Sequence, residues 1–536
     1  MNRIIKSALC IFAAVTVMAG CAGGETAQSA VNVVDAGAKA ISNAASDEPI
    51  EEFSDNPAPE TTAFEQSPAQ ITTEPIEDTP TEISTEIPVQ NSTAITQTTA
   101  INTPESTTAT TASTTSQTTS DKPAESTAQT TVHTTVQTSA QTTSQTETEI
   151  SEEEPNQEFS YSPNSYAALN HSVVKGVWIS YIELAEMLTG KSASEFRAAI
   201  GKAYNNCISL GLNTVFVHVR SHGDAYYDSD LFAWSKYASG TFGKDPGFDP
   251  LDIMIDEAHS RGLSFQAWIN PLRCCGTGEI SGAEGTAVYS WANGTATAGK
   301  YIVNVGGTYY MNPAYGEVID YIAEGAAEIA ANYDVDGVHI DDYFYPTTDS
   351  SFDSAAFNAS SSGSLSDFRF ANCDRLVRAL YSSVKAANPT ALFGVSCQGS
   401  MENNYNLMYA DVKKWCTESG YVDYIAPQIY YGFDNSAQPY KTCTSEWNDL
   451  AKQGGIPLIV GLSASKIGLE DTWAGAGKTE WITDENILAR QLEYAEGMSS
   501  YGGVCLYSYR SVFTPESGVR DKVNKETEAL KITLND

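Results

Sequence analysis

The sequence predicts an α/β protein whose folded part is a (β/α)8 TIM barrel, preceded by a long disordered Ser/Thr-rich linker. Three observations predict this fold: eight short apolar runs recur along the chain, helical stretches alternate with them, and no Gly-rich phosphate-binding turn follows the first run. Eight strands alternating with helices indicate a parallel sheet that closes into a barrel. The alternative, an open doubly wound sheet, usually carries such a glycine-rich turn.

The first element is a secretory signal over residues 1–20. It combines a basic start at Arg3 and Lys6 with an apolar run over residues 8–19 that is too short for a lasting transmembrane span. The small residues before Cys21 resemble a bacterial lipobox, so we expect cleavage there and lipidation of Cys21. Ordinary signal cleavage, with Cys21 left as a plain thiol, is the alternative. We therefore expect an extracytoplasmic protein, lipid-anchored to the outer face of the bacterial cell membrane.

Residues 21–165 form the second element, a predicted disordered linker rich in Thr, Ser and Glu. Runs such as TTATTASTTSQTTS contain almost no large apolar side chains, and between residues 51 and 158 the only Lys or Arg is Lys122. Such a segment cannot bury enough apolar surface to offset the entropy of ordering it. The formal net charge of −37 lies partly in this linker. No basic stripe that could neutralise phosphates is present, which argues against nucleic acid as a partner.

The predicted barrel spans residues 172–531. Its strands are VKGVWIS (174–180), NTVFVHV (213–219), LSFQAWIN (263–270), DGVHIDD (336–342), ALFGVS (391–396), VDYIAPQIYY (422–431), PLIVGLSA (457–464) and GVCLYSY (503–509). Helices are predicted between them. In DPLDIMIDEAHSRG, Asp249 suits the N-cap, Pro250 the first turn and Gly262 the end, and a second helix is expected to begin in the same way at Asn312.

Loop lengths indicate which end of the predicted barrel carries the site. Segments from a helix to the next strand are short, as in SRGLSFQ. Segments from a strand to the next helix are long, as in residues 271–311 and 344–365, well beyond the usual few residues. Length is therefore concentrated at the C-terminal face, where barrel enzymes keep their active sites.

Two adjacent acids end the fourth predicted strand, in the stretch DVDGVHIDDYFYP. Since side chains alternate along a strand, His339 and Asp341 point to the barrel axis, whereas the apolar residues on either side of His339 point to the helices. Asp342 lies at the rim, where it either turns inward or caps a local turn. Burying a carboxylate at the barrel axis is unfavourable, so Asp341 is expected to have a bonding partner or a catalytic role.

Aromatic and polar side chains collect at the same end of the predicted barrel. Sugars present apolar C–H faces and a rim of hydroxyls, so their binding sites combine flat rings with carboxylates and amides. An aromatic stripe alone is more often packing, but beside an axis-facing acid we interpret it as sugar recognition. The candidate substrate-binding residues are Arg220, Trp268, Asn270, His339, Tyr343, Tyr345, Gln428 and Tyr430. Arg220 could instead form a structural ion pair with Asp224.

Residues 174 to about 465 resemble the glycosyl-hydrolase-like 10 family (DUF187), a group of bacterial secreted and lipoprotein hydrolases. The resemblance rests on GVWIS, on VFVHVRSHGDAYYDSDLFAWSKYASGTFGKDPGFDPLDIMIDEAHSRGLSFQAWINPLR, on YDVDGVHIDDYFYP and on YIAPQIYYG. It implies a TIM-barrel glycosidase, and some relatives act on bacterial cell-wall glycan. HIDD also resembles the fourth-strand pattern of amylase-type barrels, which implies that Asp341 is the nucleophile. The chain departs from the family after Arg220, where a proline is expected, and in the extra CCGTGEISG after Arg273.

Glycoside hydrolysis needs an acid that protonates the leaving oxygen and a carboxylate that attacks the sugar or activates water. Asp341 is the first candidate for the carboxylate, and Asp342, Asp224 and Glu402 are candidates for the acid. We expect cleavage within a β-linked polysaccharide, with cell-wall glycan (peptidoglycan) ahead of dietary polymers, and no metal or cofactor. A catalytically inactive carbohydrate-binding lipoprotein is the alternative. A Schiff-base aldolase built on Lys466 leaves the paired acids unexplained.

Eight cysteines lie in the predicted barrel: Cys207, Cys274, Cys275, Cys373, Cys397, Cys416, Cys443 and Cys505. None forms part of a zinc-type pair of C-x-x-C motifs. Outside the cytoplasm some of them could form disulfides, and they could equally remain small buried hydrophobic residues.

Overall fold

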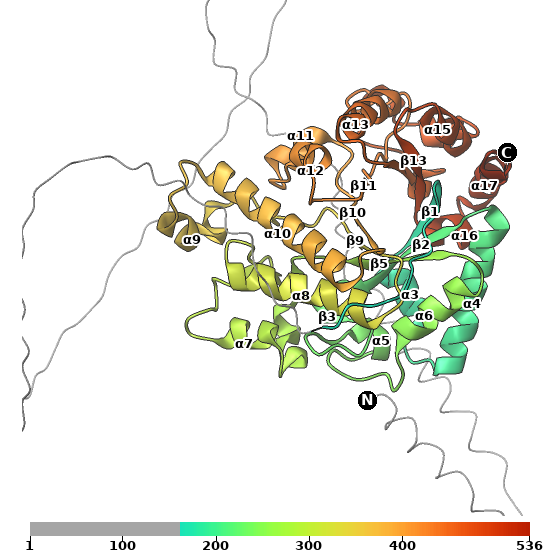
Figure 1. Ribbon diagram of the computed structural model, residues 1–536. Helices are drawn as coiled ribbons and strands as arrows, with labels where there is room; N and C mark the ends of the chain where they lie inside the picture. The colour runs from blue at the N-terminus through green and yellow to red at the C-terminus, as the bar shows by residue number, and fades with distance from the viewer. Residues whose placement is uncertain (1–160, 536) are drawn as a thin grey trace, which may run out of the picture. The chain divides into compact units, whose positions relative to one another are not determined.

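The computed structural model describes residues 161–535, so the predicted signal, Cys21 and nearly all of the predicted linker lie outside the described part (Figure 1). In the described part the predicted barrel is confirmed: eight parallel strands close in the order β1-β13-β12-β11-β10-β9-β5-β2. These strands are β1 (Val174–Ile179), β2 (Thr214–Arg220), β5 (Ser264–Ile269), β9 (Gly337–Ile340), β10 (Leu392–Val395), β11 (Tyr424–Ile425), β12 (Leu458–Ser463) and β13 (Tyr501–Tyr507).

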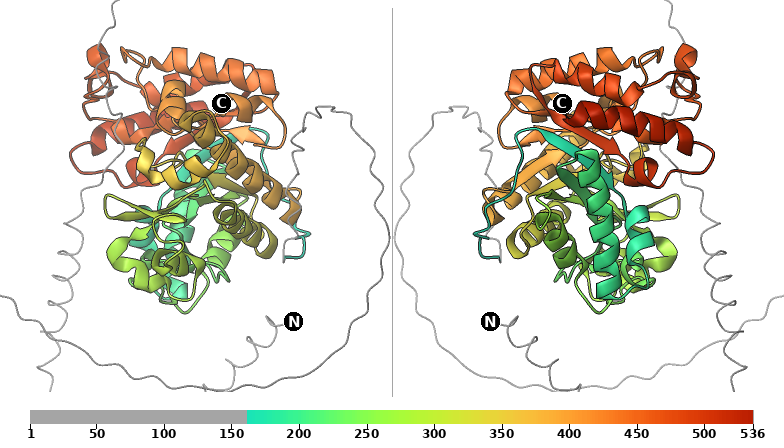
Figure 2. Two further views of the ribbon diagram at one scale, coloured as in Figure 1. Left: turned by 90° about the vertical axis from the view of Figure 1, so that its left-hand side faces the viewer. Right: turned by 90° about the vertical axis from the view of Figure 1, so that its right-hand side faces the viewer.

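Helices surround the strands, as the side views also show (Figure 2). The longer ones are α4 (Ala193–Leu210), α6 (Pro250–His259), α8 (Gly316–Asn332), α10 (Leu365–Ala387), α13 (Tyr440–Gly454), α15 (Ile487–Glu496) and α17 (Arg520–Asn535). The shorter ones are α3 (Tyr181–Leu188), α5 (Lys236–Ser239), α7 (Ala287–Asn293), α9 (Ser354–Ala359), α11 (Met401–Asn406), α12 (Val412–Thr417), α14 (Glu480–Thr483) and α16 (Tyr509–Phe513).

The helix start predicted from the sequence is correct for α6 and lies a few residues too early for α8. At α6, the Asp249 carboxylate accepts hydrogen bonds from the backbone N–H groups of the first turn, and Pro250 is the first helical residue. Helix α8 begins at Gly316, not at Asn312. The Asn312 side chain instead donates to the Lys300 carbonyl over 2.9 Å and accepts from Ala314 N, which holds a turn before the helix.

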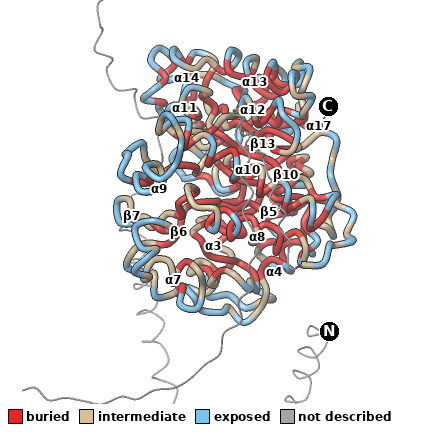
Figure 3. Tube along the Cα trace, turned by 60° about the vertical axis from the view of Figure 1, so that its left-hand side comes forward, coloured by how far each residue is buried: buried red, intermediate tan, exposed pale blue. Residues whose placement is uncertain are grey.

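The core has two layers, one inside the barrel and one between the barrel and the helices. Buried residues are concentrated in the middle of the described part of the chain (Figure 3). Trp178, Phe216, Trp268, Tyr424, Ile459 and Cys505 fill the barrel. Outward-facing apolar side chains such as Val338 and Ile340 pack with the helices in the larger outer layer. The alternation predicted for the fourth strand is therefore present in β9.

The long loops at the C-terminal face have structure of their own. Residues 271–311 contain a three-stranded antiparallel sheet of β6 (Arg273–Gly276), β8 (Thr308–Met311) and β7 (Ile302–Val305). The loop after β2 contains the short pair β3 (Asp224–Ala225) and β4 (Ala233–Trp234). These small sheets fix side chains above the barrel that free loops would leave mobile.

The segment that precedes β1 is hydrogen-bonded to the barrel. The Asn164 side chain donates to the Tyr333 carbonyl over 3.1 Å. Tyr166 Oη and the backbone N–H of Leu169 both donate to Oδ1 of Asp336, which directly precedes β9 at the opposite end of the barrel from the long loops. Hydrogen bonds hold this segment to the barrel. The pattern of apolar residues therefore could not predict these contacts.

All eight cysteines of the described part are free and buried. In this part of the chain they act as small apolar side chains, which is one of the two alternatives that the sequence left open. Across residues 161–535, no helix is both long enough and apolar enough to cross a membrane.

Candidate active site

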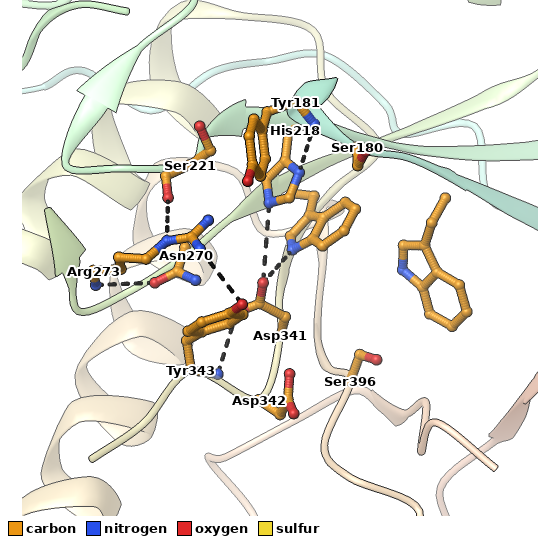
Figure 4. A network of polar contacts seen from close by, with 12 residues as sticks. Ser180, Tyr181, His218, Ser221, Asn270, Arg273, Asp341, Asp342, Tyr343 and Ser396 are labelled. Atoms are coloured by element: carbon orange, nitrogen blue, oxygen red, sulfur yellow. Dashed lines mark hydrogen bonds and ion pairs between the residues drawn. The ribbon is translucent and has the colours of Figure 1, made fainter. Parts of the chain in front are cut away.

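Asp341 lies at the mouth of the barrel, directly after β9, where Figure 4 shows it between Tyr343 and His218. The indole Nε1 of Trp268, on the neighbouring strand β5, donates to its Oδ2 over 3.0 Å. The backbone N–H of Tyr343 lies 3.4 Å from its Oδ1. The residue is only 3 % exposed. The axis-facing placement predicted for Asp341 is confirmed by these contacts.

Burial, followed by the charge of Asp342, raises the pKa of Asp341 to about 7. The guanidinium of Arg273 and the hydrogen bonds from Trp268 and Tyr343 act in the opposite direction because they favour the ionised form. Asp341 therefore titrates near neutral pH, where it can be converted between its two forms at little cost.

Asp342 is half-buried, and its side chain lies on the side of β9 that faces β10 and β11. Nε2 of Gln428, which follows β11, donates to Oδ1 of Asp342 over 3.1 Å. The same amide lies 3.4 Å from the carbonyl of Ser396, which follows β10. Burial raises the pKa of Asp342 as well. Because two adjacent carboxylates repel each other, ionisation of one raises the pKa of the other. The pair can therefore present one protonated and one ionised carboxyl group.

The sequence interpretation did not include His218 in the site. The alternation of side chains along β2 could have indicated that His218 points to the barrel axis. Its imidazole stacks on the Trp268 indole, with ring centroids 3.4 Å apart and planes 20° apart. Nδ1 accepts the backbone N–H of Tyr181 over 3.1 Å, and Nε2 lies 3.9 Å from Oδ2 of Asp341. Phe216, two residues earlier, is inside the barrel, so the same alternation places His218 at its axis.

Arg273 is a second residue that the sequence interpretation left out of the site. Its guanidinium stacks on Tyr343, 4.6 Å from the ring centroid, and faces Tyr181 at 5.5 Å. Nε donates to the Ser221 carbonyl over 3.3 Å (Figure 4). Arg273 belongs to β6 in the long loop, and sequence alone gave no way to place that loop over the barrel.

Several predicted substrate-binding residues lie around the acids. Tyr430 is half-buried at the mouth, stacked on Tyr507 at 5.5 Å and edge-on to Trp178 at 6.5 Å. Asn270 is fully buried, and its Oδ1 accepts the backbone N–H of Arg273 over 3.0 Å, which orients the loop that carries the guanidinium. Trp268, Tyr343 and Gln428 contact the two acids directly.

The structure places His339 one layer deeper than predicted. It is fully buried in the barrel, where Nε2 accepts the indole N–H of Trp178 over 3.2 Å and Nδ1 lies 2.9 Å from Tyr424 Oη. Burial lowers its pKa to about 3, so the ring is neutral at neutral pH. With both ring nitrogens engaged by the barrel core, His339 supports the layer beneath Asp341 and offers no atom to a substrate.

Tyr345 and Arg220 also lie away from the mouth. Tyr345 is 1 % exposed and its Oη accepts the Asn372 side chain from α10 over 2.9 Å. Arg220 is fully buried, with its guanidinium 4.4 Å from the Phe232 ring centroid, and within residues 161–535 its nitrogens have no hydrogen-bond partner, Asp224 included. A register shift in β2 between His218 and Arg220 redirects this side chain toward the helix layer.

Asp224 and Glu402, two of the candidate acids, are not brought to the carboxylate pair. Asp224 is buried, and its Oδ1 accepts the backbone N–H groups of Ser221 and His222 over 3.0 and 2.8 Å. It thereby shapes the turn after β2. Glu402 is exposed on α11. Of the three candidates for the acid, Asp342 is the one beside Asp341.

Lys466, the residue on which an aldolase would depend, lies in an ion pair. Its Nζ is 2.9 Å from Oδ2 of Asp471, which is 5 % exposed. A Schiff-base lysine must instead be held neutral and free to attack a carbonyl. The geometry at Lys466 therefore gives no support to the aldolase alternative.

A closed parallel barrel with paired acids and stacked aromatic rings at its C-terminal mouth defines the class of glycosyl-hydrolase-like barrels. A model of the family Glycosyl hydrolase-like 10 matches residues 173–475, and the chain belongs to this family. It is 31% identical over 349 residues to "Glycosyl hydrolase YngK" of Bacillus subtilis (strain 168), a match that covers 60% of this chain and 67% of the relative.

The chain is also similar to a second bacterial relative and to a solved bacterial glycoside hydrolase domain. The chain is 29% identical over 367 residues to "Glycosyl hydrolase DigH" of Escherichia coli (strain K12), which covers 62% of this chain and 82% of the relative. Among solved structures, the glycoside hydrolase domain of PgaB (BpsB) from Bordetella bronchiseptica is 13% identical with a TM-score of 0.44, over 68% of this chain and 99% of that domain.

Proposed function

We propose that the barrel is a glycoside hydrolase that cleaves within a β-linked polysaccharide by a two-carboxylate mechanism. The observation that carries the proposal is the pair Asp341 and Asp342, in which the first carboxyl group accepts an N–H from Trp268 and the second an N–H from Gln428. The two groups lean toward opposite neighbouring strands, so a sugar at the mouth can meet both of them.

Asp341 is assigned as the carboxylate that attacks the anomeric carbon or activates the water that does so. The Trp268 N–H and the Arg273 guanidinium both favour its ionised form. Asp342 is assigned as the acid that protonates the leaving oxygen, because it is the acid adjacent to Asp341 and burial raises its pKa. Tyr430 and Tyr507, both half-buried and stacked on each other, supply ring faces at the mouth for the apolar faces of the sugars, and the buried Trp178 packs edge-on against Tyr430 from below.

The substrate class follows from placement as well as from the site. In this proposal, an acyl anchor at Cys21 and the predicted linker over residues 21–165 would confine the barrel to a shell outside the membrane, on the order of 50–70 Å deep if the linker behaves as a flexible chain. This zone faces the cell wall, and anchoring is useful for an insoluble or tethered glycan. We therefore propose cell-wall glycan (peptidoglycan) ahead of dietary polymers as the substrate.

The experiment is a panel of glycans, including peptide-free cell-wall glycan, incubated with purified protein and with the Asp341→Asn variant. The proposal expects new reducing ends and internal fragments with the wild-type protein and none with the variant. Release of single terminal sugars only would contradict cleavage within the chain. Membrane fractionation of the wild-type and Cys21→Ala proteins tests the anchor separately, and equal release of both into the medium would contradict it.

The alternative is a catalytically inactive barrel that binds carbohydrate. It would use the same aromatic mouth and would bind glycan without releasing reducing ends. The panel separates the two, since an inactive binding protein retains insoluble glycan in a pull-down assay and leaves its length distribution unchanged.

A further inference from the structure

His218 is held in one orientation by the elements on either side of it. Its ring lies against Trp268 on β5, and the backbone N–H of Tyr181, at the start of α3, donates to Nδ1. The residue is 3 % exposed. A stacked ring with one nitrogen bound to the main chain has little freedom to turn, so the direction of the other nitrogen is fixed.

The hydrogen bond from Tyr181 also fixes the tautomer. Because Nδ1 accepts a proton donor, a neutral His218 carries its own proton on Nε2. Burial, followed by the charge of Arg273, holds the pKa of His218 well below its usual range, so the ring stays neutral. His218 is therefore a fixed N–H donor at the mouth.

This donor is aimed at Asp341 but does not reach it. Nε2 lies 3.9 Å from Oδ2, beyond hydrogen-bond distance, and it has no other hydrogen-bond partner among residues 161–535. A buried N–H that is left without an acceptor is unfavourable, because it has lost its hydrogen bonds to water. A single oxygen atom to the side of the line that joins Nε2 and Oδ2 can lie within hydrogen-bond distance of both.

We propose that His218 and Asp341 together bind one hydroxyl group of the sugar beside the scissile bond. The hydroxyl oxygen accepts the Nε2–H of His218, and its proton is donated to Oδ2 of Asp341. Oδ1 remains available for the reaction at the anomeric carbon. His218 is then a substrate-positioning residue that makes the sugar sit in one register against Asp341, and this role rests on the function proposed for Asp341.

Two substitutions separate donation from packing. His218→Gln places an amide oxygen where it can accept the Tyr181 N–H and an amide N–H toward Asp341. His218→Phe keeps a flat ring on Trp268 and removes both polar atoms. We expect His218→Phe to lower kcat/KM on peptide-free cell-wall glycan by about 10–100-fold, mainly in kcat, because the sugar loses its register. His218→Gln should stay within about threefold of wild type.

Equal losses in the two variants, or wild-type kinetics in His218→Phe, would overturn the proposal. Circular dichroism and melting temperature check that both variants fold. A second measurement does not require turnover: the full-length chain has six histidines, so 15N-histidine NMR can resolve the His218 ring. We expect a neutral ring protonated at Nε2, whose Nε2–H signal shifts when solubilised peptide-free glycan is added.

A ring protonated at Nδ1, or an Nε2–H signal that bound glycan does not move, would contradict the role of His218 even if the protein is an active enzyme. Conversely, a glycan-dependent shift without any release of reducing ends would support the hydroxyl site while contradicting the proposed hydrolysis. The two failures are therefore distinguishable.

Discussion

The indole Nε1 of Trp268 donates to Oδ2 of Asp341 over 3.0 Å, and this hydrogen bond joins two neighbouring strands at the mouth of the barrel. A donated N–H favours the ionised carboxylate, whereas burial and the charge of Asp342 favour the protonated one. The two effects leave the pKa of Asp341 at about 7. Its titration thus falls in a range where activity and stability can both be measured.

The first prediction concerns the pH dependence of turnover. If Asp341 acts as an ionised carboxylate, kcat/KM should rise with pH through an apparent pKa near 7. Trp268→Phe removes the donor that lowers this pKa, so the rising limb should move to higher pH by about one unit. A pH–rate profile of both proteins measures the shift. A limb that moves to lower pH, or does not move, would show that Asp341 does not control it.

The second prediction concerns stability. The folded-state pKa of Asp341 is about 7, above the unfolded value of about 4, so its contribution is fully present below pH 4 and is lost as pH rises through 7. Asp341→Asn should therefore gain stability over wild type as pH rises from 4 to 8, by on the order of 2–4 kcal/mol.

Denaturant unfolding at several pH values measures this difference, with Asp449→Asn, at an exposed position on α13, as the matched control. The control should show a difference from wild type that stays nearly constant with pH. If Asp341→Asn and the control behaved alike, Asp341 would be as well solvated in the folded state as in the unfolded chain.

The third prediction concerns the segment before β1. Asp336 is fully buried and accepts hydrogen bonds from Tyr166 Oη and Leu169 N, in addition to Phe265 N and a contact with His259. A chain that begins at residue 161 should melt like the full-length protein, because the predicted linker adds no core. A chain that begins at residue 173 leaves this carboxylate with two donors fewer, and its melting temperature should fall by roughly 5 °C or more.

Tyr166→Phe in the chain that begins at residue 161 removes one of these donors and should give an intermediate melting temperature. Identical melting of the chains that begin at 161 and 173 would mean that the segment rests on the barrel without stabilising it.

The fold could be predicted almost completely, because strands and helices each repeat a local pattern that survives in the structure. The alternation of side chains along β9 also predicted that Asp341 points to the barrel axis. The pattern failed where the chain leaves regular geometry: a register shift in β2 redirects Arg220 to the helix layer, and the segment after β9 buries Tyr345 against α10. Arg273 reaches the site only through a small sheet within a long loop, which no local signal predicts.

The central claim is that Asp341 makes this barrel a glycoside hydrolase, and the most direct test is reducing-end release from peptide-free cell-wall glycan by wild type and Asp341→Asn at equal concentration. Asn keeps the shape of the side chain and the acceptor for Trp268, so the variant should fold and bind glycan. We expect its turnover to fall by at least about 10³-fold. Turnover close to that of wild type in a folded Asp341→Asn protein would contradict the account.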